Sequence, residues 1–117
     1  VINDDTLPRF RCRIIAGPAN NQLADSRHGD RLHSQGILYA PDYIINAGGV
    51  INVADELKDG YNHERALRAV EIIPRNLAAI FSASQRDNIP TYKLADQLAE
   101  NRIAVIGKIK SIFLPQR

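Results

Sequence analysis

The sequence contains few of the residues that build covalent or metal sites. It has one cysteine, Cys12, and no methionine or tryptophan among its 117 residues. One cysteine cannot form a disulfide within the chain, and no second cysteine provides the spacing of a zinc site. The histidines His28, His33 and His63 form no i, i+4 pair and have no carboxylate partner at ligand spacing, so we expect no metal site. Such cysteine usage is typical of reducing compartments, and we expect a cytoplasmic protein.

Long apolar runs and an excess of one charge are also absent. No stretch approaches the roughly 18 apolar residues of a membrane helix, and the first five residues lack a signal pattern. The net charge of +2 is spread without runs of one sign, so we expect neither membrane nor nucleic-acid binding. The strongest basic cluster is Arg9, Arg11 and Arg13. Its alternation with Phe10 and Cys12 predicts a strand with one solvated face, and a phosphate-binding stripe is the alternative.

The first part of the chain is typical of short strands around one helix. A helix is predicted over residues 25–35, where Gly36 would end it. Gly17 and Pro18 stop the first apolar run, which suits a buried strand better than a helix. The apolar runs that predict strands are residues 13–16, 37–39 and 43–45.

From Asn46 onward the apolar period changes from two to about three and a half. Asn46 is a favoured residue for capping a helix N-terminus. Val50, Val53 and Leu57 follow at i, i+3 and i+7, so they share one face of the predicted helix, which Gly60 would close. Without further information, such a face is ordinarily part of the core.

Two further helices are predicted in the remaining chain. Asn62 would cap the first, which ends near residues 88–90, and Thr91 would start the second, which Pro115 stops. Pro74 lies inside the first and predicts either a bend or a break into two shorter helices. Their apolar positions are Leu67, Val70, Ile73, Leu77, Ile80 and Phe81, then Leu94, Leu98, Val105, Ile109 and Phe113. Strands followed by long helices indicate a piece of an open α/β domain.

Two long strings carry a resemblance to a known family. Residues 14–23 (IIAGPANNQL), followed by RHGD at residues 27–30, form the first, and residues 36–57 (GILYAPDYIINAGGVINVADEL) form the second. Together they resemble the leucine dehydrogenases and their glutamate, phenylalanine and valine relatives, and similarity continues along nearly the whole chain. Local departures are Pro18, where small residues are usual, a connection at residues 58–59 that is one residue longer, and Pro74 in place of an aromatic residue.

The resemblance implies a fold and a division of the chain. Residues 1–57 would be the C-terminal half of a Rossmann-like NAD-binding domain with a doubly wound parallel sheet. Residues 58–117 would be long closing C-terminal helices in the same structural unit. We expect the chain to be a fragment of a larger enzyme that forms a homo-oligomer.

The activity implied is NAD-dependent oxidative deamination of an apolar L-amino acid, giving a 2-oxo acid and ammonia. We expect no catalytic residue in this chain, because its first lysine is Lys58, and the catalytic lysine of the family lies in a preceding segment. The glycines also never take the G-x-G-x-x-G spacing. Asp42, Asp55 and Glu56 are interpreted as helix and loop charges rather than as an acid/base pair. This polypeptide alone should therefore not turn over substrate.

The resemblance assigns cofactor contacts to two turns. The residues that would bind NAD are Ala16, Gly17, Asn20, Asn21 and Asn46. Gly17 permits close backbone approach, and the Asn20 and Asn21 amides would reach the nicotinamide carboxamide. The alternative for Asn20 and Asn21 is an Asx-turn that only satisfies loop backbone.

The resemblance also assigns the substrate pocket. The residues that would bind the amino acid are Asn46, Gly49, Val50 and Val53. Gly49 lets a ligand approach a helix N-terminus, which favours a carboxylate. Val50 and Val53 would line the side-chain pocket, and an aliphatic pair cannot satisfy a buried carboxylate, so leucine or another branched-chain substrate is expected over glutamate. The alternative function is a non-catalytic truncated module that acts in binding or oligomer assembly.

Overall fold

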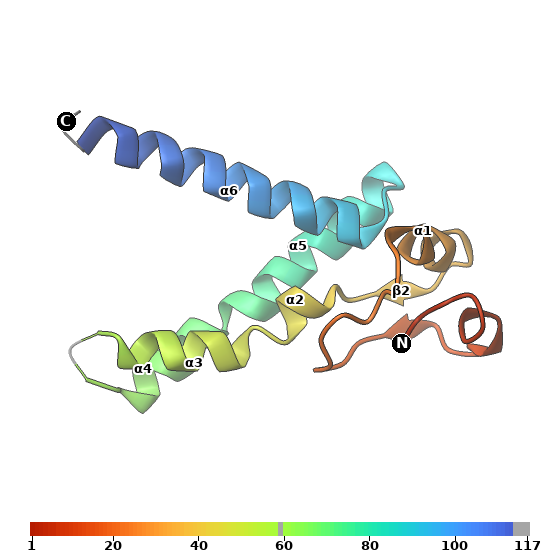
Figure 1. The fold of residues 1–117 in the computed structure, drawn as a ribbon, viewed down its shortest axis with the longest axis horizontal. Coiled ribbons are helices and arrows are strands. Elements are labelled where there is room, and N and C mark those ends of the chain that lie inside the picture. The colour runs from red at the N-terminus through yellow and green to blue at the C-terminus, as the bar shows by residue number, and fades with distance from the viewer. Residues whose placement is uncertain (59, 114–117) are drawn as a thin grey trace.

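The computed structural model describes residues 1–58 and 60–113, with side chains up to residue 107. The chain forms an elongated body with axes of 52 × 34 × 25 Å, from which the last helix projects (Figure 1). The elements in order are η1, a 3₁₀ helix (Leu7–Arg9), β1 (Ile14–Ile15), α1 (Ser26–Ser34), β2 (Leu38–Tyr39), α2 (Asp42–Ile45), α3 (Gly48–Glu56), α4 (His63–Val70), α5 (Ile72–Asp87) and α6 (Thr91–Phe113).

A βαβ unit forms the centre of the body. β1 and β2 pair in parallel, with Ile14 opposite Leu38 and Ile15 opposite Tyr39, and α1 connects them. The predicted α/β class is confirmed at this level. In the part of the chain described here the sheet has two strands, so a full doubly wound sheet remains an expectation.

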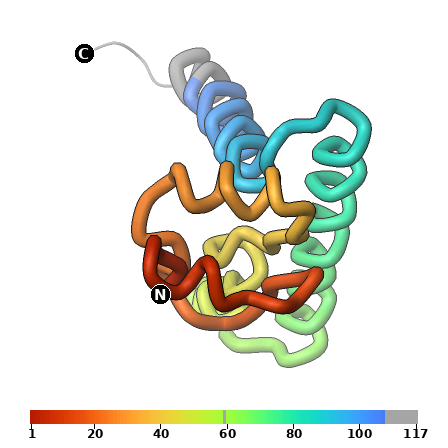
Figure 2. Tube along the Cα trace, turned by 90° about the vertical axis from the view of Figure 1, so that its right-hand side faces the viewer, coloured from red at the N-terminus to blue at the C-terminus, as the bar shows by residue number. Residues whose placement is uncertain are grey.

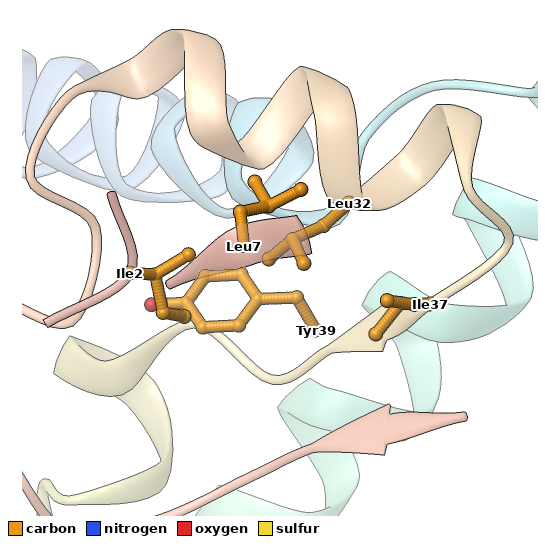
Figure 3. Packing of buried hydrophobic residues seen from close by; sticks show 5 residues of the cluster. All are labelled: Ile2, Leu7, Leu32, Ile37 and Tyr39. Carbon is orange, nitrogen blue, oxygen red and sulfur yellow. The ribbon is translucent and has the colours of Figure 1, made fainter. Parts of the chain in front are cut away.

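The main core lies between α1, β2 and the amino-terminal segment (Figure 3). Its side chains are Ile2, Leu7, Leu32, Ile37 and Tyr39. Burial raises the pKa of the Tyr39 phenol to about 12. The Thr91 hydroxyl donates to the Tyr39 carbonyl oxygen at 2.7 Å, which fixes the start of α6 against β2. This core therefore holds β2 and the residues that follow it.

The predictions for the basic cluster and the first strand were wrong in part. Leu7–Arg9 forms η1 instead of strand, because Leu7 is buried in the core and Pro8 suits the start of a helical turn. Arg11 and Arg13 are exposed as expected, but Cys12 between them is exposed as well, so burial does not alternate. Ile14 was expected to be buried but is 61% exposed, because a two-stranded sheet covers β1 with few neighbours.

The region around Asn46 also differs from the prediction. Residues 43–45 belong to α2, a single helical turn after Pro41, and are not a strand, since three apolar residues have too little period to decide. Asn46 ends α2 as its C-cap, whereas α3 begins at Gly48 after Ala47. The side chain of Asn46 is therefore not used to cap α3.

The local helix signals in the second half were confirmed. The Asn62 side chain accepts from the Arg65 amide at 2.9 Å, and Asn88 ends α5 in the left-handed conformation with φ of +52°. The single long helix is broken at Glu71, between α4 and α5. Pro74 is the third residue of α5, where the helix needs no backbone N–H donor. The predicted break into two shorter helices is therefore confirmed, rather than a bend in one helix. Pro115 lies outside the described residues.

Asp55 joins the end of α3 to the start of α4. Its carboxylate is 3% exposed and accepts from the Asn62 amide at 2.8 Å and from Arg65 Nε at 2.5 Å. Arg65 also donates to the carbonyl of Gly60, which has φ of +89°. The Arg65 guanidinium holds the pKa of Asp55 below its ordinary value. Asp55 is thus a helix charge, as interpreted from the sequence, but one that is buried and paired with Arg65.

Asp55→Asn is expected to lower the thermal midpoint by several degrees near neutral pH. The folded pKa of Asp55 is depressed, so its stabilising contribution exists above the unfolded value of about 3.9 and is lost as pH falls through the folded pKa. Thermal melts from neutral to acidic pH should show the two proteins converging. The exposed Asp5 offers a control, since Asp5→Asn should change little at any pH. A deficit of Asp55→Asn that stays constant down to strongly acidic pH would contradict this account.

Candidate functional site

The site forms where two strands end at the same edge of the sheet. Residues 16–23 follow β1, and α2 follows β2 after Pro41. Carboxyl ends of parallel strands are the usual place for ligands in α/β folds. Figure 2 shows α2 and α3 (yellow) beside α5 (green to cyan), which α2 contacts.

Asn20 and Asn46 hold the two turns together. The Asn46 Nδ2 amide group donates to Asn20 Oδ1, although the residues are 26 apart in sequence. Asn21 has a φ of +53°, a left-handed conformation that asparagine tolerates better than most residues. The turn is therefore more than an Asx-turn closed on its own backbone, because it is joined to the end of α2.

An open cavity of about 470 Å³ borders this junction. Its lining residues are Asn20, Asn21, Asp42, Tyr43, Asn46, Ala47 and Val50. Val50 is 74% exposed, so the predicted apolar face of α3 is no core face here. Four of the residues that sequence analysis singled out, two from each turn region, thus lie around one space.

The other predicted site residues do not line this cavity. Val53 is 55% exposed on α3, one helical turn after Val50. Ala16 and Gly49 are also exposed, and Gly17 is half-buried at the start of the loop. A Cβ atom placed on Gly17 or Gly49 would meet no atom within 4 Å, so packing inside this chain does not require glycine at either position.

Asp42 is a site residue whose environment the sequence did not reveal. It was interpreted as a loop or helix charge, but it is 8% exposed. Its Oδ2 accepts from the Gln22 amide at 2.8 Å, and its Oδ1 accepts from the Tyr43 amide at 2.8 Å. The sequence feature that could have placed Asp42 at the site is its spacing from Asn46, since residues four apart lie on one side of a helical turn.

Tyr43 connects the site to the last helix. Its hydroxyl donates to Asp96 Oδ1 at 2.5 Å and lies 3.2 Å from the Tyr92 carbonyl oxygen. Burial and the nearby Asp96 carboxylate raise the pKa of the Tyr43 phenol well above its usual range. The phenol therefore stays protonated near neutral pH and acts as a hydrogen-bond donor.

The chemistry around the cavity fits a carboxamide group. A nicotinamide carboxamide offers an NH₂ donor and a carbonyl acceptor, and asparagine side chains supply the complementary acceptor and donor. Asn20, Asn21 and Asn46 place three such amides at the rim of the cavity, and Ala47 and Val50 add apolar surface. Within residues 1–58 and 60–107, no three His, Cys, Asp or Glu side chains gather as metal ligands would. No helix in the described ranges combines the length and apolar character needed to cross a membrane.

Comparison with known proteins gives clear relatives. No family model matches the chain. The chain is 56% identical over 114 residues to the leucine dehydrogenase of Geobacillus stearothermophilus. The aligned region covers 97% of this chain and 31% of that protein. The chain is 46% identical over 114 residues to the phenylalanine dehydrogenase of Thermoactinomyces intermedius, again covering 97% and 31%.

A solved structure shows the same arrangement. The crystal structure of L-tryptophan dehydrogenase from Nostoc punctiforme matches with a TM-score of 0.84 and 44% identity, over 92% of this chain and 32% of that one. The chain thus spans about a third of the length of the relatives that it matches.

Proposed function

We propose that this chain, which is homologous to a segment of the leucine and phenylalanine dehydrogenases, forms one wall of the cofactor and substrate site of an NAD-dependent amino-acid dehydrogenase. The observation that carries the proposal is the junction of Asn20 and Asn46 beside Val50 at one cavity. Fold and homology together favour a doubly wound NAD-binding domain, with residues 1–57 as its second half and residues 58–117 as closing helices. Assembly into a homo-oligomer belongs to the same proposal.

The asparagine turn serves the cofactor. When bound, NAD accepts the hydride that leaves the α-carbon of the amino acid. Asn20 and Asn21 bind the nicotinamide carboxamide, and the half-buried Gly17 and exposed Ala16 let the ring approach the backbone. Asn46 fixes this turn and reaches toward both cofactor and substrate.

The beginning of α3 serves the substrate. Val50 and Val53 present aliphatic surface toward the side chain of the amino acid, and neither can satisfy a carboxylate there. The names of the relatives, leucine and phenylalanine dehydrogenase, support an apolar substrate. We favour leucine or another branched-chain amino acid, because identity to the leucine dehydrogenase is the higher of the two.

A chimeric enzyme tests the proposal. The chain replaces the matching 114-residue segment of the Geobacillus stearothermophilus leucine dehydrogenase, which provides the remaining two thirds of the enzyme. We expect the chimera to form NADH with leucine at a rate within about tenfold of the parent rate. Misplacement of the reacting groups by 1 Å costs about a hundredfold in rate, so a rate in this range requires that the chain position its residues as the parent segment does. A chimera that folds and assembles like its parent but forms no NADH would instead favour a non-catalytic module that acts in binding or assembly.

Gly49→Ala separates a ligand-approach role from a structural one. A Cβ atom at Gly49 meets nothing within the chain, and alanine favours helix by up to about 1 kcal/mol, so the variant should be slightly more stable than wild type. If substrate lies against α3, the same methyl group should raise KM for leucine about fivefold, the effect of roughly 1 kcal/mol. Thermal melts and initial rates of the chimera measure both quantities.

Gly107→Ala on α6 is the matched control for Gly49→Ala. A Cβ atom there also meets nothing within 4 Å, so the gain in stability should be similar and KM for leucine should stay unchanged. An equal and unchanged KM in both variants would remove Gly49 from the substrate site.

A further inference from the structure

Both ends of α2 contact the loop that carries Asn20 and Asn21, the asparagine loop. Asp42 is the first residue of this one-turn helix, and Asn46 is the residue that ends it. The four-residue spacing places both side chains on the same side of the turn. Asp42 accepts from the amide of Gln22, while Asn46 donates to the side chain of Asn20. The loop is thus attached on either side of Asn21.

The backbone of Gln22, which Asp42 contacts, is also hydrogen-bonded to the amino-terminal segment. The Gln22 carbonyl oxygen accepts from the Ile2 amide at 2.7 Å and from the amino group of Val1 at 3.2 Å. With its amide bonded to Asp42 as well, the peptide groups on both sides of Gln22 have little freedom to rotate. Asn21 precedes Gln22 directly and has the left-handed φ of +53°. The orientation of the Asn21 side chain therefore depends on the bond from Gln22 to Asp42.

A carboxylate is a costly choice for such a contact. Burying a charge without a cation nearby is unfavourable, and in the described part of the chain no ion pair includes Asp42. The two hydrogen bonds that Asp42 accepts from backbone amides are charge-assisted, so they are stronger than hydrogen bonds to a neutral acceptor. Asp55 on α3 is also buried, but it pairs with Arg65 and accepts from the Asn62 amide, so its bonds join α3 to α4. The two aspartates thus offer a comparison within one chain.

We propose that Asp42 is a positioning residue for cofactor binding, which acts by holding the Asn20–Asn21 turn in the orientation that receives the nicotinamide carboxamide. The inference rests on the proposed function and extends it to a residue that carries no chemistry of its own. Asp42 borders the cavity, but it reaches the cofactor through the loop that it holds.

The first test is the Kd for NADH, measured by fluorescence titration of the chimera with Asp42→Ala, Asp42→Asn and Asp55→Asn. Asp42→Ala should raise this Kd about tenfold or more, as expected for loss of a charge-assisted hydrogen bond, while KM for leucine changes less than about twofold. Asn keeps one acceptor oxygen for Gln22, so Asp42→Asn should recover a large part of the affinity. Asp55→Asn should lower the thermal midpoint and leave the Kd for NADH unchanged.

The second test uses the full 117-residue chain without cofactor. Hydrogen exchange of the Gln22 amide should be faster in Asp42→Ala than in wild type, and near the wild-type rate in Asp55→Asn. Unchanged exchange, or an NADH affinity that falls equally in the Asp42 and Asp55 variants, would overturn the inference. Should Asp42→Ala fail to fold, Asp42→Asn decides: it should raise the Kd for NADH and speed exchange of the Gln22 amide by smaller but measurable factors, and no change in either would overturn the inference. A wild-type chimera that binds no NADH would contradict the proposed function, whereas the exchange result still tests the hold of Asp42 on the loop.

Discussion

Asn46→Ala is expected to lower kcat/KM for NAD-dependent oxidation of leucine by about a hundredfold in the chimera, equivalent to roughly 2.7 kcal/mol of transition-state stabilisation. The substitution removes the donor that joins the end of α2 to Asn20, and in the proposed site it also removes a contact to cofactor and substrate. Both losses fall on the geometry in which hydride transfer occurs, where small displacements are costly.

A double-mutant cycle with Asn20→Ala shows whether the two asparagines act together. Their side chains share one hydrogen bond, so the double variant should be only slightly worse than the more damaged single variant. Asn101→Ala, at an exposed position of α6, is the control and should leave kcat/KM unchanged. Fully additive losses at Asn20 and Asn46 would mean that their contact has no part in the site.

Gly29→Ala is expected to destabilise the chain by about 1–3 kcal/mol, in spite of the helix preference of alanine, which favours the substitution by up to about 1 kcal/mol. Gly29 is buried in α1, and a Cβ atom there would lie 2.5 Å and 2.7 Å from Cδ1 and Cε1 of Tyr92. Tyr92 packs against the core and its hydroxyl donates to Asp30 at 3.1 Å, so the ring cannot easily move aside. Urea unfolding measures the free energy.

Two further variants establish that the effect of Gly29→Ala is steric. Gly107→Ala places the same methyl group in open space on α6 and should change stability in the opposite direction. Adding Tyr92→Leu should reduce the cost of the alanine at position 29, because the ring atoms that it meets are gone. An equal penalty with and without the Tyr92 ring would exclude the contact as the cause.

Local signals were read correctly from the sequence. Asn62, Gly36 and Asn88 mark helix ends through their own backbone preferences and hydrogen bonds to near neighbours, and the structure places them at such ends. The resemblance drawn from residues 14–23 and 36–57 is confirmed by the relatives that match. Information of this kind needs no knowledge of the packing.

What the sequence could not show depends on contacts between distant residues. Asn46 was expected to cap α3, but Asn20, 26 residues earlier, takes its side chain. Asp42 was interpreted as a helix or loop charge, and the sequence did not show that it is buried and accepts from the amide of Gln22, 20 residues earlier. Val50 is likewise exposed because little of the described chain packs against it. Apolar periodicity predicts which residues share a helix face, but not whether another element covers that face.

The projecting α6 has a mechanical consequence. Its 23 residues make a rod of about 35 Å at 1.5 Å per residue, and Tyr43 contacts the rod at Asp96, in its second turn. A tilt of about 5° about this base moves the far end by roughly 3 Å, while the base itself shifts by a small fraction of that distance. Because Tyr43 belongs to α2, the hydrogen bond from its phenol to Asp96 joins the base of this rod to the helical turn that carries Asp42 and Asn46.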